Sequence, residues 1–345
     1  MTEGWNVAVV GATGAVGREM LQILQERSFP VASLRAMASP RSAGKTLPFG
    51  DTEVEVEALS GADFDGVDIA LFSAGSSVSE AHAPRAAKHG ATVIDNTSAF
   101  RMDDDVPLVV PEVNAHVLDD VDTDGGSIIA NPNCSTIQMV VALAPLQQKW
   151  GLERVVVSTY QSASGAGQAG VDQLVAELRD WAERGGGADD RPDRGGDAFE
   201  HPLAFDALPW IGSTDDSGFS TEELKMVHET RKIMEAPSLS VASHCVRVPA
   251  VRSHSESLTV DLQQPVDVDG AQRAFARAPG LRVHDSPADN EYPTSRLAEG
   301  NNETWVGRIR RDLENPETLH FWVVSDNLRK GAAWNSIQIA EQLFT

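Results

Sequence analysis

The chain has 345 residues and a formal net charge of −23, from 51 acidic and 28 basic side chains. It is long enough for two domains, and its acidity disfavours nucleic acid and anionic membranes as partners. No apolar run approaches the roughly 20 residues of a membrane helix, and the N-terminus lacks the basic segment of a secretory signal. Two cysteines cannot form a disulfide framework, so we expect a cytoplasmic protein in a reducing compartment.

The acidic residues gather in runs that are typical of a solvated surface. A calcium-binding array is disfavoured because these runs lack the alternating acidic positions and central glycine of a calcium loop. We therefore predict no metal site and an adaptation to high salt, where the screening length falls to a few ångströms. The acidic runs occupy residues 103–105, 119–120, 189–190 and 215–216.

The first third of the chain alternates short apolar runs with helical patterns. Helices are predicted at residues 17–26 and 77–89. This order is typical of a Rossmann-like, doubly wound parallel sheet in an α/β protein. The predicted buried strands occupy residues 7–10, 68–72, 91–94 and 128–130.

From residue 152 onward the pattern changes to alternating strands, which predict a mostly antiparallel sheet with one face wet or in an interface. A loop rich in Gly, Asp and Arg at residues 185–196 is expected to be mobile. Thr221 is expected to N-cap a helix over residues 221–234. The other predicted elements are strands at 155–160, 241–248, 255–262, 305–311 and 318–324 and helices at 169–183 and 328–344.

The last predicted helix is short enough to pack back on the first domain, which would make that domain discontinuous. We therefore expect one domain at residues 1–132 and 328–345. Residues 133–327 then form a second, α+β domain with the antiparallel sheet.

A glycine-rich loop follows the first predicted strand and opens a helix. Glycines let the backbone approach a pyrophosphate, and the helix N-terminus favours its charge, so the loop predicts dinucleotide binding. The spacing is G-x-x-G-x-x-G, and the alternative is a tight turn without a ligand. The loop comprises Gly11, Ala12, Thr13, Gly14, Ala15, Val16 and Gly17.

The second strand of such a fold selects between dinucleotides, because NAD-specific sites carry a carboxylate there for the ribose. Here the segment after residue 38 provides Ser39, Arg41 and Ser42 and no acidic side chain. Hydroxyls and a cation suit a 2′-phosphate, so we predict NADP. A polar surface loop is the alternative.

Cys134 follows Asn131-Pro132-Asn133 directly and precedes a helical run over residues 135–144. The unpaired N–H groups and dipole of a helix start favour the thiolate, the reactive form of cysteine. A small buried hydrophobic side chain is the alternative.

Four further segments place polar side chains where a ligand could bind. Arg101 follows a strand that ends at the carboxyl edge of the sheet, where it could hold a phosphate or pair with residues 103–105. Gln161 stands in a glycine-rich turn at the end of a strand. The remaining candidates are Glu222 and Lys225, three apart on a helix, and Arg247 and His254, a carboxylate-binding cation and a proton carrier with a pKa near neutrality.

Together these motifs resemble the aspartate-β-semialdehyde dehydrogenases, in the form widespread in bacteria. The resemblance runs nearly end to end and implies NADPH, phosphate-activated aspartate, and the biosynthesis of lysine, threonine, methionine and diaminopimelate. It also implies a catalytic and dimerisation role for the second domain, in a homodimer or homotetramer. The segments that carry it are residues 11–17, 95–114, 131–135, 160–167, 222–226, 247–256 and 325–342.

The resemblance assigns a role to each candidate. Cys134 would be the nucleophile and His254 the acid/base, while Gln161 would orient the acyl intermediate. The substrate carboxylate would meet Arg247, its amino group Glu222, and its phosphate Arg101, Asn133 and Lys225. The implied cofactor contacts outside the glycine loop are Ser39, Arg41, Ser42, Ser73, Ala74, Gly75, Ser164, Gly165 and Asn327.

Two departures and two rivals accompany the resemblance. Ser253 stands where the family commonly has Gly, which would strain the backbone if φ is positive there. The loop at residues 185–196 is atypical in composition and bears on the subunit contacts. N-acetyl-γ-glutamyl-phosphate reductase shares the cysteine and histidine, but its acylated substrate offers no ammonium to Glu222. A silent dinucleotide-binding paralogue would have lost Cys134 or His254, and both are present.

Overall fold

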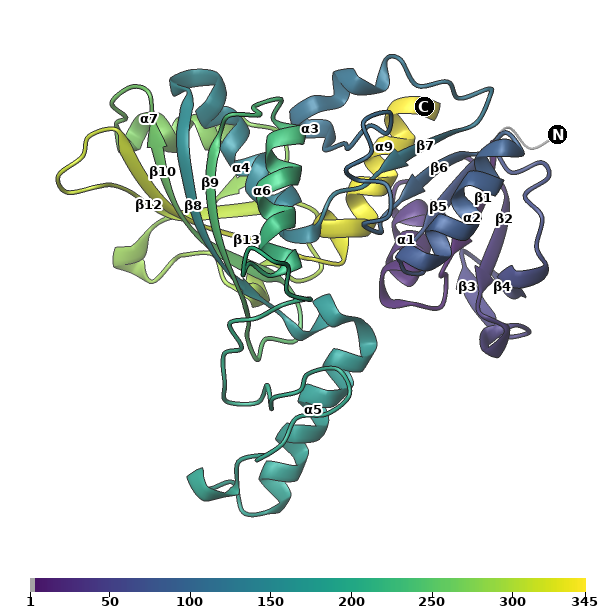
Figure 1. Ribbon diagram of the computed structural model, residues 1–345, viewed down its shortest axis with the longest axis horizontal. Coiled ribbons are helices and arrows are strands. Elements are labelled where there is room, and N and C mark those ends of the chain that lie inside the picture. The colour runs from purple at the N-terminus through teal and green to yellow at the C-terminus, as the bar shows by residue number, and fades with distance from the viewer. Residues whose placement is uncertain (1–3) are drawn as a thin grey trace. The chain divides into compact units, whose positions relative to one another are not determined.

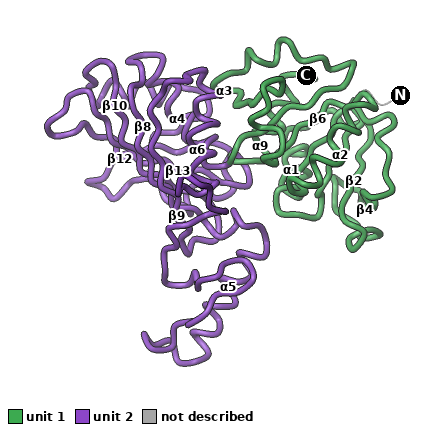
Figure 2. Tube along the Cα trace, viewed as in Figure 1, with its two compact units in different colours: residues 1–133, 331–345 green, residues 134–330 purple. Residues whose placement is uncertain are grey.

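The computed structural model describes residues 4–345, so the first three residues of the N-terminus, which entered the prediction about secretion, lie outside the described range. The chain divides into two compact units, one ending at Asn133 and resumed over Gly331–Thr345, the other covering Cys134–Lys330 (Figure 2). The domain boundaries predicted at 132/133 and 327/328 lie one and three residues from these divisions.

The first unit contains a seven-stranded sheet in the order β3-β4-β2-β1-β5-β6-β7 (Figure 1). All pairings are parallel except the β3–β4 hairpin. The chain runs outward from β1 in both directions, which confirms the predicted doubly wound sheet. The strands are β1 (Trp5–Val10), β2 (Val31–Ala38), β3 (Thr46–Phe49), β4 (Thr52–Ala58), β5 (Ile69–Phe72), β6 (Thr92–Asp95) and β7 (Ser127–Ala130).

Alternating residues of β1 face two different apolar cores, as expected for a strand covered on both sides. Val7 and Val9 pack in one core with α1 (Ala15–Glu26) and α9 (Trp334–Phe344). Ala8 and Val10 pack in the other with α2 (Ser76–Lys88). The C-terminal helix α9 thus completes the first unit, with contacts to α1 and to the short α3 (Pro111–Asn114).

The second unit contains a six-stranded sheet in the order β11-β12-β13-β10-β8-β9. Three of its pairings are antiparallel and two, β11–β12 and β8–β9, are parallel, which confirms a mostly antiparallel sheet. The strands are β8 (Leu152–Gln161), β9 (Ser240–Arg247), β10 (His254–Leu262), β11 (Leu281–Val283), β12 (Thr304–Arg311) and β13 (Thr318–Ser325).

One long apolar helix, α4 (Cys134–Trp150), packs against four strands of this sheet, β8, β10, β12 and β13. Its side chains are buried almost all round, so it forms the centre of the second unit. No helix within residues 4–345 is long and apolar enough to cross a membrane. The other helices of the unit are α5 (Gly167–Glu183), α6 (Thr221–Ile233), α7 (Val268–Arg277) and α8 (Ser295–Ala298).

The predicted N-cap of α6 is wrong by one residue. Ser220, not Thr221, occupies the cap: its hydroxyl accepts the Glu223 N–H at 3.3 Å, and the Glu223 carboxylate accepts the Ser220 N–H at 2.9 Å. This reciprocal capping box satisfies two backbone donors, which a cap at Thr221 would not achieve. The sequence has adjacent hydroxyl side chains at Ser220 and Thr221. Only Ser220 is followed three positions later by an acidic residue, Glu223, so it is Ser220 that forms the capping box.

Candidate active site

The glycine loop of the first unit leaves no room for a side chain at Gly17 or Gly11. A Cβ atom on Gly17 would lie 2.3 Å from the Gly11 carbonyl oxygen, and Gly11 itself has a φ of +88°. Gly14 forms the N-cap of α1, and the first turn of α1 carries no acidic side chain. Bare backbone at an uncharged helix N-terminus fits the pyrophosphate of a dinucleotide.

The other predicted cofactor residues of this unit follow the two strands beside β1. Ser39, Arg41 and Ser42 lie in and before a 3-10 turn that follows β2, and Arg41 is exposed. Ser73, Ala74 and Gly75 follow β5, and Gly75 caps α2 with a φ of +97°. Three adjacent parallel strands therefore present these groups at one edge of the sheet.

Arg101 is buried in the first unit and anchored by backbone. Its Nε donates to the Asn131 carbonyl at 2.9 Å and its Nη2 to the Asn96 carbonyl at 2.8 Å. The Asn131 side chain in turn binds Asn96 and Asn335. This network ties Arg101 to the segment that ends at Asn133. Asn96 and Asn335 were missed in the sequence, because asparagines without a local motif give no signal of a shared contact.

In the second unit, Cys134 is the first residue of α4, as the sequence predicted. Three other candidates lie at the ends of neighbouring strands: His254 begins β10, while Gln161 and Arg247 end β8 and β9 and pair in register. Burial lowers the pKa of Arg247, and the negative charges of Glu222 and, to a smaller extent, Cys134 offset part of this effect. The cation of Arg247 is thus close enough to stabilise a thiolate at Cys134.

The hydrogen bonds of His254 determine its tautomer. The backbone N–H of Ser162 donates to Nδ1 at 3.0 Å, so Nδ1 carries the lone pair and Nε2 the proton. Burial, together with the positive charge of Arg247, lowers the pKa of His254 to about 3. The imidazole is therefore neutral at physiological pH, which corrects the expected pKa near neutrality.

Gly165 allows the turn after β8 to approach both His254 and Arg247. A Cβ atom there would lie 2.6 Å from Nη1 of Arg247 and 3.1 Å from Nε2 of His254. The same Nη1 donates to the Ser162 carbonyl at 2.7 Å. The N–H of Ser162 thus holds the imidazole of His254, and its carbonyl holds the guanidinium of Arg247.

Glu222 and Lys225 form a half-buried pair on α6. Nζ of Lys225 lies 3.1 Å from Glu222, whose side chain is 7% exposed against 32% for Lys225. The other Glu222 oxygen accepts from Nε2 of Gln161 at 3.1 Å. Because Glu222 is buried, this pair is shielded from water, unlike the solvated ion pair that i,i+3 spacing usually produces.

Asn327 connects three segments around His254. Its Oδ1 accepts from the Ser253 N–H at 2.9 Å and from the hydroxyls of Ser164 and Ser162 at 3.1 and 3.2 Å. Ser253 has a φ of +71° and is fully buried, so the backbone does adopt the conformation that favours glycine. The contribution of Ser162 was missed, because a serine in a turn is unremarkable in sequence.

Comparison with known proteins identifies the family. Residues 6–121 match the semialdehyde dehydrogenase NAD-binding domain, and residues 143–330 match the semialdehyde dehydrogenase dimerisation domain. The aspartate-semialdehyde dehydrogenase of Aquifex aeolicus is 50% identical over 341 residues, which cover 99% of this chain and 98% of the relative. The Bacillus subtilis enzyme of the same name is 48% identical over 344 residues, with the same two coverages. The chain belongs to the aspartate-semialdehyde dehydrogenase family.

A solved relative extends this similarity to three dimensions. Aspartate semialdehyde dehydrogenase II from Vibrio cholerae, crystallised in complex with ASA, matches the enzyme with a TM-score of 0.93 at 44% identity. The match covers 99% of this chain and 98% of the relative. These findings support the aspartate-semialdehyde dehydrogenase prediction and not the rival N-acetyl-γ-glutamyl-phosphate reductase.

The second cysteine of the enzyme, Cys245, lies in β9 and is fully buried. Burial, reinforced by the negative charge of Glu222, raises the pKa of its thiol far above the ordinary value. Of the two cysteines, only Cys134 therefore has a setting that favours the thiolate.

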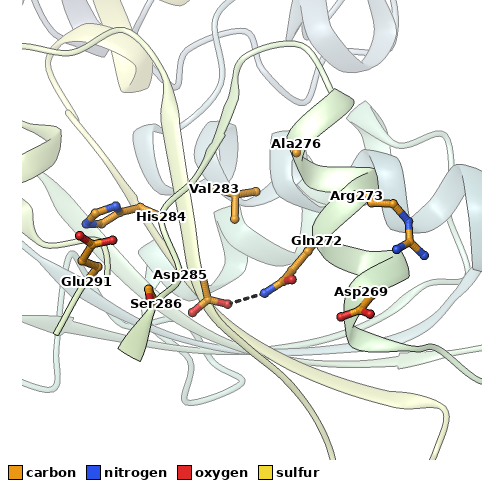
Figure 3. Close-up of a pocket in the computed structure, with 9 residues that line it drawn as sticks. All are labelled: Asp269, Gln272, Arg273, Ala276, Val283, His284, Asp285, Ser286 and Glu291. Atoms are coloured by element: carbon orange, nitrogen blue, oxygen red, sulfur yellow. Dashed lines mark hydrogen bonds between the residues drawn. The ribbon is translucent and has the colours of Figure 1, made fainter. Parts of the chain in front are cut away.

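A separate cleft of about 520 Å³ lies between α7 and the segment that follows β11 (Figure 3). Its lining mixes charges of both signs, and Gln272 donates to Asp285 across it at 3.2 Å. None of the predicted site residues lines it. The lining residues are Asp269, Gln272, Arg273, Ala276, Val283, His284, Asp285, Ser286 and Glu291.

Proposed function

We propose that the enzyme converts L-aspartyl 4-phosphate to L-aspartate 4-semialdehyde and phosphate, with NADPH as reductant, through a thioester on Cys134. The observation that supports this most is the arrangement of Cys134 at a helix start beside Arg247, in the unit where His254 begins β10 and Gln161 ends the neighbouring β8. A helix dipole and a buried cation both favour the thiolate, which is the nucleophile the reaction needs.

In the proposed reaction the Cys134 sulfur forms a bond to the acyl carbon, and the bond from that carbon to the phosphate oxygen breaks. When bound, NADPH would supply the hydride that reduces the thioester. His254 holds its proton at Nε2, where it donates a hydrogen bond that stabilises the developing oxyanion until the carbon–sulfur bond breaks and the aldehyde leaves with the thiolate restored. The tautomer imposed by Ser162 suits this role, since His254 begins as a donor at that atom.

The proposed substrate contacts use side chains of both signs. Arg247 would bind the substrate carboxylate and Glu222 its ammonium group, while Arg101, Lys225 and Asn133 would surround the phosphate. Gln161, which already donates to Glu222, would orient the acyl group. Glu222 is the residue that argues for aspartate, because an N-acetylated substrate offers no ammonium group to its carboxylate.

We infer NADP rather than NAD from the segment after β2. Arg41 and the flanking hydroxyls of Ser39 and Ser42 suit a 2′-phosphate, and residues 31–45 include no carboxylate that would repel it. The remaining proposed cofactor contacts are the glycine loop, residues 73–75, Ser164, Gly165 and Asn327. The proposed reaction belongs to the biosynthesis of lysine, threonine, methionine and diaminopimelate.

We also propose a homodimer, or a tetramer built from it, that uses the sheet face opposite α4. Tyr160 of β8 points away from the α4 side, because the buried Gln161 and Thr159 beside it point toward that side. Its ring packs on Trp322 of β13 with centroids 5.2 Å apart, and Tyr160 is 38% exposed. Partly exposed aromatic rings on an uncovered sheet face are typical of an interface. Trp322→Arg should lower the molar mass measured by light scattering.

One assay tests substrate, cofactor and salt adaptation together. Reduction of NADP is followed with aspartate semialdehyde and phosphate at low and high KCl. The proposal predicts that NADP is used better than NAD, and that activity rises with KCl. It also predicts that N-acetylglutamate semialdehyde is a poor substrate. Better use of the acetylated substrate would contradict the role of Glu222, and highest activity in dilute buffer would contradict the salt adaptation.

A further inference from the structure

A second layer of polar side chains lies one step below the candidate site. His254, Gln161 and Arg247 share the end of the sheet in the second unit. Two residues farther along the same strands, Glu256 pairs with Thr159, and Thr159 pairs with Cys245. Residues two apart on a strand face the same side, so this second row lies on the same face as the catalytic row.

The helix α4 contributes to the same two layers. Gln138 follows Cys134 by four residues, one helical turn, and therefore lies on the same side of α4. Its amide is close enough to Glu256 to lower the pKa of that carboxyl slightly, although burial raises this pKa far more. On α4, Cys134 thus corresponds to the catalytic row and Gln138 to the second row.

The four side chains of the second layer are almost completely buried: Glu256, Thr159 and Cys245 are 0% exposed and Gln138 is 1% exposed. Both oxygens of Glu256 and both amide atoms of Gln138 lack a hydrogen-bond partner within the described residues. One further step along the strands, Leu258 pairs with Val157 in the apolar core. The polar layer is therefore enclosed between the candidate site and the core.

Burial, more than any neighbouring charge, decides the protonation state of Glu256. The ionisable group that Glu256 influences is Cys245 on β9, whose own pKa is raised partly by the Glu256 charge. Burial is the main effect on the Glu256 carboxyl, and no cation offsets it among the groups that influence it. An unpaired carboxylate in such a place is costly, whereas a protonated carboxyl can donate and accept hydrogen bonds.

We propose that Glu256 and Gln138, bridged by internal water, form an uncharged polar layer beneath the catalytic residues, in which Glu256 is a positioning residue for Cys134 and His254. Unpartnered buried polar atoms are commonly satisfied by internal water, and four of them face this layer. A neutral Glu256 leaves the cation of Arg247 and the helix start to favour the Cys134 thiolate, which a buried negative charge would oppose. The proposal rests on the roles proposed above for Cys134 and His254.

The test compares Glu256→Gln, which keeps the shape without a titrating group, with Glu256→Leu, which removes the hydrogen-bonding groups. Asp261→Asn on the same strand is the matched control, because Asp261 is half-buried and hydrogen-bonded to Thr318. For each variant we would measure kcat, KM, the pH dependence of Cys134 alkylation by iodoacetamide, and the infrared band of a protonated carboxyl group.

The expected results separate a positioning role from a merely structural one. Glu256→Gln keeps kcat within about threefold and leaves the alkylation pKa unchanged, whereas Glu256→Leu lowers kcat about tenfold or more at similar KM, since small misplacements of catalytic groups are costly. The infrared band of the protonated carboxyl disappears in Glu256→Gln and persists in Asp261→Asn. A lower alkylation pKa in Glu256→Gln would show that Glu256 is charged and would overturn the proposal. Unchanged kcat in Glu256→Leu would overturn the positioning role.

Folding provides a readout that does not depend on catalysis. The raised pKa of Glu256 makes the folded enzyme bind a proton that the unfolded chain releases above its ordinary pKa. Between the ordinary pKa and the raised pKa of Glu256, raising the pH therefore destabilises the native enzyme relative to Glu256→Gln, by about tenfold in the unfolding equilibrium constant per pH unit. The absence of this trend would overturn the protonated state. If Cys134 proves dispensable, the proposed function is wrong. The pH dependence of unfolding and the infrared band would still test whether Glu256 is protonated.

Discussion

At the scale of single residues, the site depends on backbone groups that hold side chains in one state. Ser162 donates its N–H to His254 and accepts from Arg247 through its carbonyl, so one residue orients both. Burial then keeps His254 neutral and leaves Cys245 unreactive. Cys134, at the start of α4, is the exception that can ionise.

His254 should remain neutral, with the proton on Nε2, throughout the range from pH 5 to pH 8, because its pKa is lowered to about 3. Nitrogen-15 NMR of histidine-labelled enzyme checks this, and His254→Asn assigns the signal. The unfolded chain protonates this histidine below its ordinary pKa, so stability relative to His254→Asn should fall as the pH drops below about 6.5. An imidazole signal of His254 that titrates near pH 6.5 would contradict the burial argument.

Ser253→Gly should stabilise the enzyme. A non-glycine residue in the left-handed region costs about 1–2 kcal/mol of stability, which the substitution recovers. Glycine also has more conformational freedom in the unfolded chain, which reduces this stabilisation by about 0.4–1 kcal/mol. The middle of these two ranges gives a net stabilisation of about 0.8 kcal/mol, to be measured by chemical denaturation. Ser255→Gly, two residues later inside β10, is the control and should destabilise. Equal losses in both variants would show that the Ser253 backbone is not strained.

Among the helices and turns, two short features position side chains of the candidate site. The capping box of Ser220 and Glu223 starts α6 just before Glu222 and Lys225. The turn after β8 brings Gly165 against His254 and Arg247. Both features are set by local hydrogen bonds, so each can be tested by one substitution.

Ser220→Ala should destabilise the enzyme by about 1 kcal/mol, because the hydroxyl accepts the Glu223 N–H at the buried start of α6. Thermal unfolding should register this as a loss of about 2–4 °C. Thr221→Ala is the control, since Thr221 accepts only an exposed N–H from Ser213, at 3.1 Å. A larger loss in Thr221→Ala than in Ser220→Ala would return the cap to Thr221.

Periodicity predicted the long elements well, because strands such as β1 and helices such as α1 are apolar where they are buried. It missed the β3–β4 hairpin, whose polar Thr52–Ala58 strand carries glutamates on an exposed face. For the site, motifs indicated Cys134 and His254. They could not indicate Ser162 or Glu256, whose importance depends on contacts between residues far apart in the chain.

At the scale of the whole molecule, the two units divide the proposed work. The first presents a glycine loop and an anchored Arg101, and the second contains Cys134, His254 and Arg247. The chain as a whole is strongly acidic, with a net charge of −23. Cationic groups near the site would then guide anionic substrates inward against this background.

A pre-steady-state measurement without phosphate tests whether Cys134 carries the acyl group. Aspartate semialdehyde and NADP are mixed with the enzyme, and NADPH formation is followed before and after phosphate is added. We expect one NADPH per active site, then steady turnover once phosphate releases the acyl group. Cys134→Ala should lose both phases by about a thousandfold or more. Steady turnover by Cys134→Ala would contradict the covalent mechanism.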